Sequence, residues 1–162
     1  MNTLIGDSAH GKNRAYEVIK HNNFVDEVKS LNNHFSDAGL FGISVTGAGS
    51  HSADLLQVAT EELSKLKDRV SDEELARAKN RLKMNILLNL EKQDDRLEEI
   101  AKNFLTFGDL TFHKYCDQID AVTADDIHRA AGHALQSKPT MVVTGGAINL
   151  VPGITDVQRQ LH

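Results

Sequence analysis

The spacing of apolar and polar positions changes near residue 50, and the two parts of the chain predict different elements. Residues 40–46 (Leu-Phe-Gly-Ile-Ser-Val-Thr) form the clearest strand, because apolar and β-branched side chains dominate them. Residues 24–35 are expected to be extended as well. The turn signal Asp37-Ala38-Gly39 joins the two segments, which predicts an antiparallel hairpin. A short helix over residues 13–22 precedes it, with one face formed by Tyr16, Ile19 and Ala15.

Helical spacing dominates the chain after residue 50. Apolar residues recur there at intervals of three and four, as on an amphipathic helix, at Leu55, Leu56, Ala59, Leu63, Leu66 and Val70. Ser71 and Glu74 predict a capping box at the start of a second helix, which runs for about five turns to Leu90. A third helix is expected from Asp94 or Asp95 to Gly108, with inward side chains at Leu97, Ile100, Ala101, Phe104 and Leu105.

Two shorter helices follow, over residues 111–119 and 123–135. The second has a clear start signal, because the side chain of Thr123 can cap the helix and Asp126 lies three residues further on. One more short helix is expected after Pro152.

A last strand is predicted over residues 141–144, between Pro139 and the glycine pair that follows. Val142 and Val143 are adjacent and both apolar, so this strand should be buried on both faces and needs neighbours. The series of elements predicts an α+β fold, in which an antiparallel sheet has helices packed on one face. Without an internal repeat or a linker-like stretch, residues 1–162 are interpreted as one module.

Composition narrows the class of protein. The 162 residues are 40% hydrophobic and 25% charged, which excludes a disordered or low-complexity chain. The formal net charge of −5 disfavours a nucleic-acid partner, and a single cysteine excludes an internal disulfide framework. No apolar run approaches the roughly 20 residues that span a bilayer, and residues 1–6 carry no targeting pattern. Any organellar address would have been removed or would lie outside this chain.

Residues 6–13 (Gly-Asp-Ser-Ala-His-Gly-Lys-Asn) come close to a phosphate-binding loop, in which glycine amides, a lysine and a hydroxyl hold a nucleotide. Two features weaken the match. Asn13 stands where the loop needs a hydroxyl, and Asp7 places a negative charge where phosphates would lie. We therefore expect a plain surface loop. The nucleotide-binding alternative predicts ATP binding with magnesium that is lost in Lys12→Ala.

A second pattern resembles a zinc site, because imidazole and thiolate groups both suit zinc: His113, Cys116, His128 and His133. The segment between Cys116 and His128 predicts helix, break and capped helix rather than a finger, so we expect solvated histidines and a half-buried Cys116. Metallopeptidase and nucleophile-elbow motifs do not occur, and the Asp7-Ser8-His10 group is a neighbourhood in sequence only.

Four pairs of adjacent carboxylates are expected on solvated outer helix faces: Glu61-Glu62, Glu73-Glu74, Asp94-Asp95 and Glu98-Glu99. The residues on their own therefore predict no catalytic, cofactor-binding or metal-binding site.

Ordered motifs cover most of the chain. They are Phe35-Ser-Asp-Ala-Gly-Leu-Phe-Gly-Ile43, residues 70–80 with 85–91, residues 119–127, and Ser137-Lys-Pro-Thr140 with Asn149-Leu-Val-Pro152. Together they resemble the C-terminal, non-catalytic half of the pitrilysin/insulinase-like peptidase superfamily. The branch that they resemble contains the mitochondrial processing peptidase subunits and the core proteins of respiratory complex III.

The resemblance implies a non-catalytic structural piece of a complex III core subunit, peripheral to the inner membrane on the matrix side, with no cofactor or metal. The alternative is a substrate-handling subunit of the matrix presequence peptidase, whose zinc would come from a beta-type chain. Residues 89–91 and 138–139 favour the alpha type, whereas residues 78–80 and 2–6 look more beta-like. The implied partners are a beta-type subunit, the missing N-terminal part of an alpha-type subunit and other complex III subunits.

Two departures from the family pattern matter. The family's zinc motif lies in its first half, which has no counterpart here. The stretch that corresponds to the alpha subunit's glycine-rich loop, residues 6–12, holds only two glycines, which puts presequence handling by this loop in doubt. The family module also begins with further strands, so this chain is expected to be not quite one whole module and to cover about a third of the family's usual two-half chain. We expect another segment or chain to complete its sheet, because an open apolar edge would aggregate.

Overall fold

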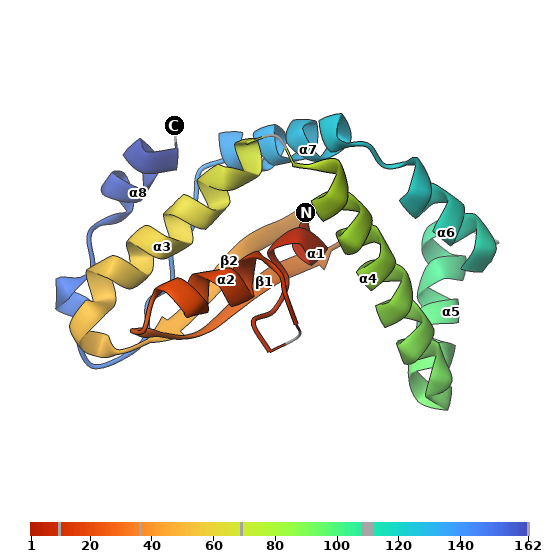
Figure 1. Cartoon of the computed structure of the whole chain (residues 1–162), viewed down its shortest axis with the longest axis horizontal. Coiled ribbons are helices and arrows are strands. Elements are labelled where there is room, and N and C mark those ends of the chain that lie inside the picture. Colours follow the sequence, from red (N-terminus) through yellow and green to blue (C-terminus); the bar gives the residue numbers. More distant parts are fainter. Residues whose placement is uncertain (10, 36, 69, 108–111, 162) are drawn as a thin grey trace.

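The computed structural model describes residues 1–9, 11–35, 37–68, 70–107 and 112–161. Among these residues a two-stranded antiparallel hairpin forms the sheet, with β1 at Val25–His34 and β2 at Gly39–Gly47. The register places Val28 opposite Val45, and both predicted strands are confirmed. Residues 7 and 29 add an isolated antiparallel bridge on the far side of β1. Helices lie mainly on one face of this hairpin, as expected (Figure 1).

The α-helices follow the predicted order, with one addition at the start. The α1 turn was not predicted, and neither were the short 3₁₀ turns η1 and η3. The remaining α-helices agree with the predicted segments to within a few residues. The bounds are α1 Asn2–Ile5, α2 Arg14–His21, η1 Gly49–His51, α3 Ser52–Ser64, η2 Lys65–Lys67, α4 Asp72–Glu91, α5 Gln93–Phe107, α6 Phe112–Ala121, α7 Ala124–Gln136, η3 Ile148–Leu150 and α8 Ile154–Leu161.

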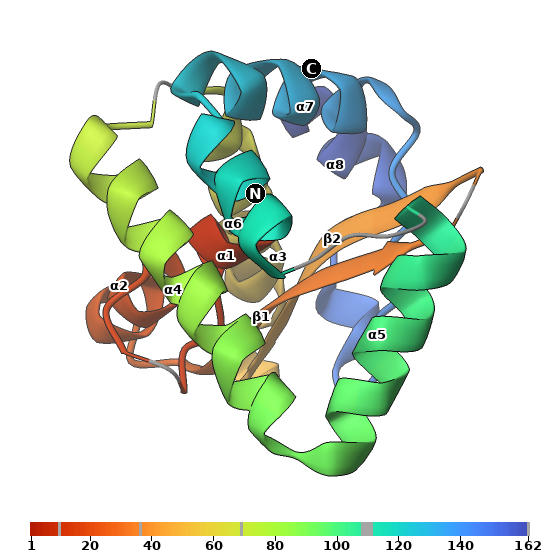
Figure 2. The same ribbon diagram turned by 90° about the vertical axis from the view of Figure 1, so that its right-hand side faces the viewer.

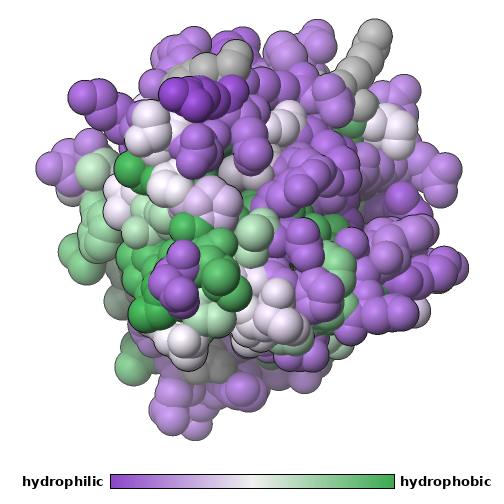
Figure 3. Space-filling model, turned by 90° about the vertical axis from the view of Figure 1, so that its left-hand side faces the viewer, coloured by the Kyte–Doolittle hydropathy of each residue, from purple (hydrophilic) through white to green (hydrophobic). Residues whose placement is uncertain are grey.

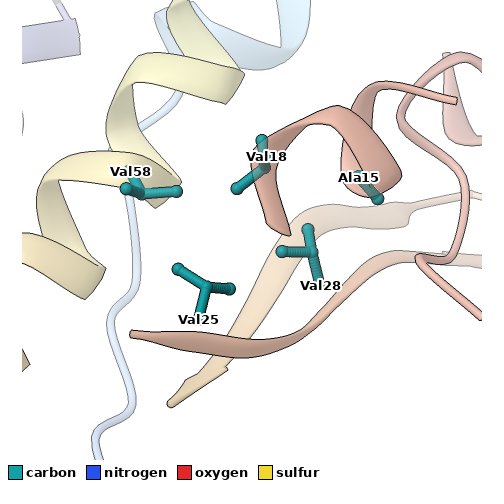
Figure 4. Close-up of a cluster of buried hydrophobic side chains, with 5 residues drawn as sticks. All are labelled: Ala15, Val18, Val25, Val28 and Val58. Carbon is teal, nitrogen blue, oxygen red and sulfur yellow. The ribbon is translucent and has the colours of Figure 1, made fainter. Parts of the chain in front are cut away.

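The main apolar cluster lies between the hairpin and helices α2 and α3. Figure 4 shows its five buried side chains, contributed by both strand and helix residues: Ala15, Val18, Val25, Val28 and Val58. Ile43 and Val45 of β2 pack against this cluster from the same face of the sheet. Tyr16, which was expected on the inner face of α2, is exposed instead. The helix turns Ala15 and Val18 toward the sheet, and this three-residue step leaves Tyr16 on the solvent side.

Local capping signals decide where two helices begin. The predicted start of α7 is confirmed as a full capping box, because the side chains of Thr123 and Asp126 each bond the other's backbone N–H. These hydrogen bonds from Thr123 lower the pKa of Asp126. Ser71 caps α4 by accepting from the backbone N–H of Glu74. The second half of that predicted box is wrong, because the Glu74 side chain bonds Arg14 instead.

The predicted inner face of α5 is wrong. Leu97 is 70% exposed and Leu105 is 84% exposed, and Ile100, Ala101 and Phe104 are exposed as well. Figures 1 and 2 show the reason, because α4 and α5 project from the side of the molecule and α5 lies away from the helices that cover the hairpin. Within the described residues, α5 packs mainly on α4. Apolar residues at helical spacing therefore predict an apolar helix face, but they do not show whether another part of the chain packs on that face.

The predicted strand over residues 141–144 is also wrong. This segment is extended without a described ladder partner, and the side chain of Val142 is 84% exposed. After it, η3 lies beside α3 and carries the exposed side chains of Ile148 and Leu150. Figure 3 shows a gathering of apolar side chains on the face where η3 lies. A strand-forming sequence needs a neighbouring strand before it can enter a sheet.

We expect Leu66→Ala to lower the free energy of unfolding by about 2–5 kcal/mol, because Leu66 is fully buried and the change leaves a cavity. The matched control is Leu97→Ala on exposed α5, which should change it by less than about 0.5 kcal/mol. Urea unfolding of both variants measures the difference. Equal losses would contradict the packing described above.

Candidate functional site

A cleft of about 580 Å³ opens between α2, α3 and α4, and α1 closes one end of it. Residues one turn apart line its walls, because α2 contributes residues 14, 17, 18 and 21 and α4 contributes 74, 77, 78 and 81. Leu4, Val18 and Val58 give it an apolar part, and most of its other lining residues are charged. It is larger than a second cleft of about 360 Å³ beside α4, so we take it as the candidate functional site.

A bidentate ion pair joins α2 to α4 across the cleft. Arg14 donates from Nε to Glu74 Oε1 at 2.6 Å and from Nη2 to Glu74 Oε2 at 3.1 Å. Its Nη1 also donates to the backbone carbonyl oxygen of Lys65, at 3.1 Å. The hydrogen bond to Glu74 raises the pKa of Arg14, although burial partly opposes this effect. Arg14 thereby joins α2 to η2 and α4, which lie 51 and 60 residues further along the chain at these contacts.

Glu62 lies in the same cleft and overturns the prediction that the carboxylate pairs all lie on solvated faces. Its residue is only 4% exposed, and its Oε1 accepts from Lys65 Nζ at 2.5 Å. Glu74 is half-buried and pairs with Arg14, whereas Glu61 and Glu73 are exposed as expected. A buried carboxylate needs a nearby cation, and Lys65 three residues along the helix supplies it.

Three further cations line the cleft, and none of them has a buried ion pair like those of Arg14 and Lys65 among the described residues. Arg77 lies 3.9 Å from Glu73 and is largely exposed. Lys12 and Arg81 also line the cleft, one on the loop before α2 and one on α4. Gly11 has a φ of +73°, and a Cβ atom built there would lie 3.4 Å from Arg81 Nη2. The positive φ favours glycine at this position, and the loop lies in van der Waals reach of the guanidinium group.

In the near-match to a phosphate-binding loop, amides that a nucleotide would need are already hydrogen-bonded within the chain. The N–H of Gly6 bonds the carbonyl oxygen of Asn2, and the N–H of Ser8 bonds that of Val28 in β1. Asn13 Oδ1 caps α2 by accepting from the N–H of Tyr16 at 2.8 Å. These amides and the cap side chain are already paired, which favours the surface-loop interpretation over nucleotide binding.

The zinc-like group is not brought together in the part of the chain that the structure describes. No set of three or more His, Cys, Asp or Glu side chains there could hold a metal ion. His128 and His133 are exposed and Cys116 is half-buried, as predicted. The His113 side chain and His10 lie outside the described parts. Ser8 Oγ accepts from the N–H of Val28 and so has a structural role.

None of the described helices is long and apolar enough to cross a membrane.

With the fold and the cleft in view, the chain can be compared with known proteins. Its residues 1–82 match the family described as the Peptidase M16 inactive domain. "Mitochondrial-processing peptidase subunit alpha-1" of Dictyostelium discoideum is 35% identical over 109 residues, which are 67% of this chain and 17% of that protein. "Mitochondrial-processing peptidase subunit beta" of Bos taurus is 30% identical over 172 residues, covering 99% of this chain and 35% of that protein.

A solved structure has a similar fold. A chain of "Complex III2 from Candida albicans, Inz-5 bound" superposes with a TM-score of 0.71 at 20% sequence identity, covering 82% of this chain and 34% of the other.

The chain belongs to the Peptidase M16 inactive domain family, because the family model matches half of its length. The resemblance found in the sequence motifs is thereby confirmed. The chain spans about a third of the length of the beta-type relatives that it matches.

We expect Arg14→Met to lower the free energy of unfolding by about 1.5–3 kcal/mol, because it leaves the Glu74 carboxylate without its charged partner. Arg77→Met on the same cleft is the control. Its ion pair is long and solvated, so the change should stay within about 0.5 kcal/mol. Chemical denaturation distinguishes the two, and a loss of the same size for Arg77→Met would refute the special role of Arg14.

Proposed function

We propose that this chain is a non-catalytic structural piece of a core subunit of respiratory complex III (ubiquinol–cytochrome c reductase). The observation that carries the proposal is the likeness in fold to a chain of a complex III assembly. Membership of an inactive-domain family supports the non-catalytic assignment. The proposed location is the matrix side of the mitochondrial inner membrane, where the chain would be held by its partners as a peripheral subunit.

We assign the chain to the alpha type. The Dictyostelium alpha-1 relative supports this, because it is 35% identical over its shorter match whereas the bovine beta relative is 30% identical. The sequence motifs at residues 89–91 and 138–139 point in the same direction. The proposed partners are a beta-type subunit, the N-terminal part of an alpha-type subunit and further complex III subunits.

The second candidate function is a non-catalytic, substrate-handling role in the heterodimeric matrix peptidase that cleaves presequences. The names of the relatives favour it, since they are processing-peptidase subunits. In this case a beta-type partner would supply the metal and the general base.

The surface of the chain supports a role inside an assembly. The N–H of Ser8 and the carbonyl oxygen of Gly6 bond Val28 and Ser30 from the side of β1 that faces away from β2. Val28 and Ser30 are paired with Val45 and Ile43, so the backbone groups of those two β2 residues also point away from the hairpin. Phe41 continues this series, and we call Phe41, Ile43 and Val45 the outer edge of β2. In the described structure no other strand covers this edge.

The exposed apolar stripe of α5 adds to the same argument. Exposed apolar side chains continue from the C-terminal half of α4 into α5: Met84, Leu87, Leu88, Leu97, Ile100, Phe104 and Leu105. Exposed apolar surface of this extent, beside an open strand edge, is typical of a protein that works in a complex. We propose that partner segments cover both surfaces in the assembly.

Purification from mitochondria distinguishes the two candidate functions. The full chain is tagged and recovered from detergent-solubilised membranes and from the soluble matrix fraction. Recovery with cytochrome subunits in the membrane fraction is the result expected for the complex III proposal. Recovery in a soluble complex that cleaves a presequence peptide would replace it with the second candidate function.

The isolated chain is predicted to associate or to unfold without a sharp transition, because its outer β2 edge and α5 stripe lack cover. Analytical ultracentrifugation and thermal unfolding of the 162-residue chain measure both properties. A monomer that unfolds in one cooperative transition would overturn the proposal that partner segments complete the module.

A further inference from the structure

Two cations that line the cleft have no ion-pair partner among the described residues. No ion pair or hydrogen bond is found there for Lys12 or Arg81, whereas Arg14 and Lys65 on the same cleft are paired with Glu74 and Glu62. Arg81 is half-buried and Lys12 is exposed. Two like charges on one cleft repel each other, and an anion near both would be favoured.

The backbone brings these two cations to the same place. Gly11 takes a φ of +73°, which a side chain rarely adopts, and a Cβ atom built on it would lie in van der Waals contact with Arg81 Nη2, at 3.4 Å. Lys12 follows directly and lines the same cleft. The loop that carries Lys12 therefore reaches the guanidinium group of an arginine that comes from a different element.

From this arrangement we infer that the cleft binds a single anionic group, through its carboxylate or phosphate oxygens, between Lys12 and Arg81. A planar guanidinium group and a flexible ammonium group together suit such an oxyanion. Glu17 and Glu61 also line the cleft, and their negative charges disfavour a polyanion such as a nucleoside triphosphate. The inference goes beyond the proposed function and stands independently of it.

The anionic group could come from an acidic side chain of a partner polypeptide or from free phosphate, and two probes separate these sources. Inorganic phosphate and the blocked peptide acetyl-Gly-Glu-Gly-amide are titrated into the full ¹⁵N-labelled chain at low ionic strength. Backbone amide shifts of Gly11 and Lys12 report binding. The variant Lys12→Ala/Arg81→Ala removes both cations, and Lys114→Ala/Lys138→Ala removes the same charge from exposed positions that do not line the cleft.

The expected result is saturable shifts at Gly11 and Lys12 that the double cleft variant weakens by about tenfold or more and that the control variant leaves unchanged. Saturation with the peptide alone identifies a partner carboxylate as the source, and saturation with phosphate identifies a phosphate group. Gly11→Ala keeps every charge but strains the loop at its φ of +73°, and it should weaken binding while the amide spectrum stays folded. The inference is overturned if neither probe shifts these amides, or if the control variant loses binding equally.

Discussion

The apolar layer between the β1–β2 hairpin and helices α2 and α3 is the contact on which the rest of the molecule depends. A hairpin of two strands is marginal in water, so it needs helices on one face to bury its side chains. Val28 from the hairpin meets Val18 and Val58 from the two helices there. The same packing sets α2 and α3 side by side, and α1 and α4 then complete the charged cleft around Arg14 and Glu74.

Because the helices pack on one face of the hairpin, two surfaces of the chain stay uncovered. Helices cover one face of the sheet, but the outer edge of β2 faces no other described strand. The arm of α4 and α5 extends beyond the hairpin (Figure 1). The apolar stripe on this arm is exposed. The β2 edge lies within the residues that match the family model, and the beta-type relatives, whose matches span most of this chain, are about three times as long. The proposed role in an assembly rests on these surfaces, because burying them requires atoms that another segment supplies.

Signals confined to a few residues could be predicted from the sequence, and those that depend on distant contacts could not. Thr123 and Asp126 cap each other across three residues, so the start of α7 was evident in the sequence. Glu74 has the same spacing from Ser71, but it bonds Arg14, which is 60 residues away in the chain. The burial of Glu62 and the exposure of Leu97 likewise depend on which elements pack together. The spacing of residues in the sequence does not show which elements pack together. The charged residues on α2 could nevertheless have indicated one wall of the cleft.

Hydrogen exchange along β2 tests the central claim most directly. The account predicts that the amides of Phe41, Ile43 and Val45 exchange much faster in the isolated chain than those of Gly42 and Ser44, whose N–H groups face β1. In the assembly recovered from mitochondria, both sets should be protected to a similar degree. Two results would contradict the account. In the first, the outward-facing amides of the isolated monomer exchange as slowly as those of Gly42 and Ser44. In the second, they still exchange fast in the assembly.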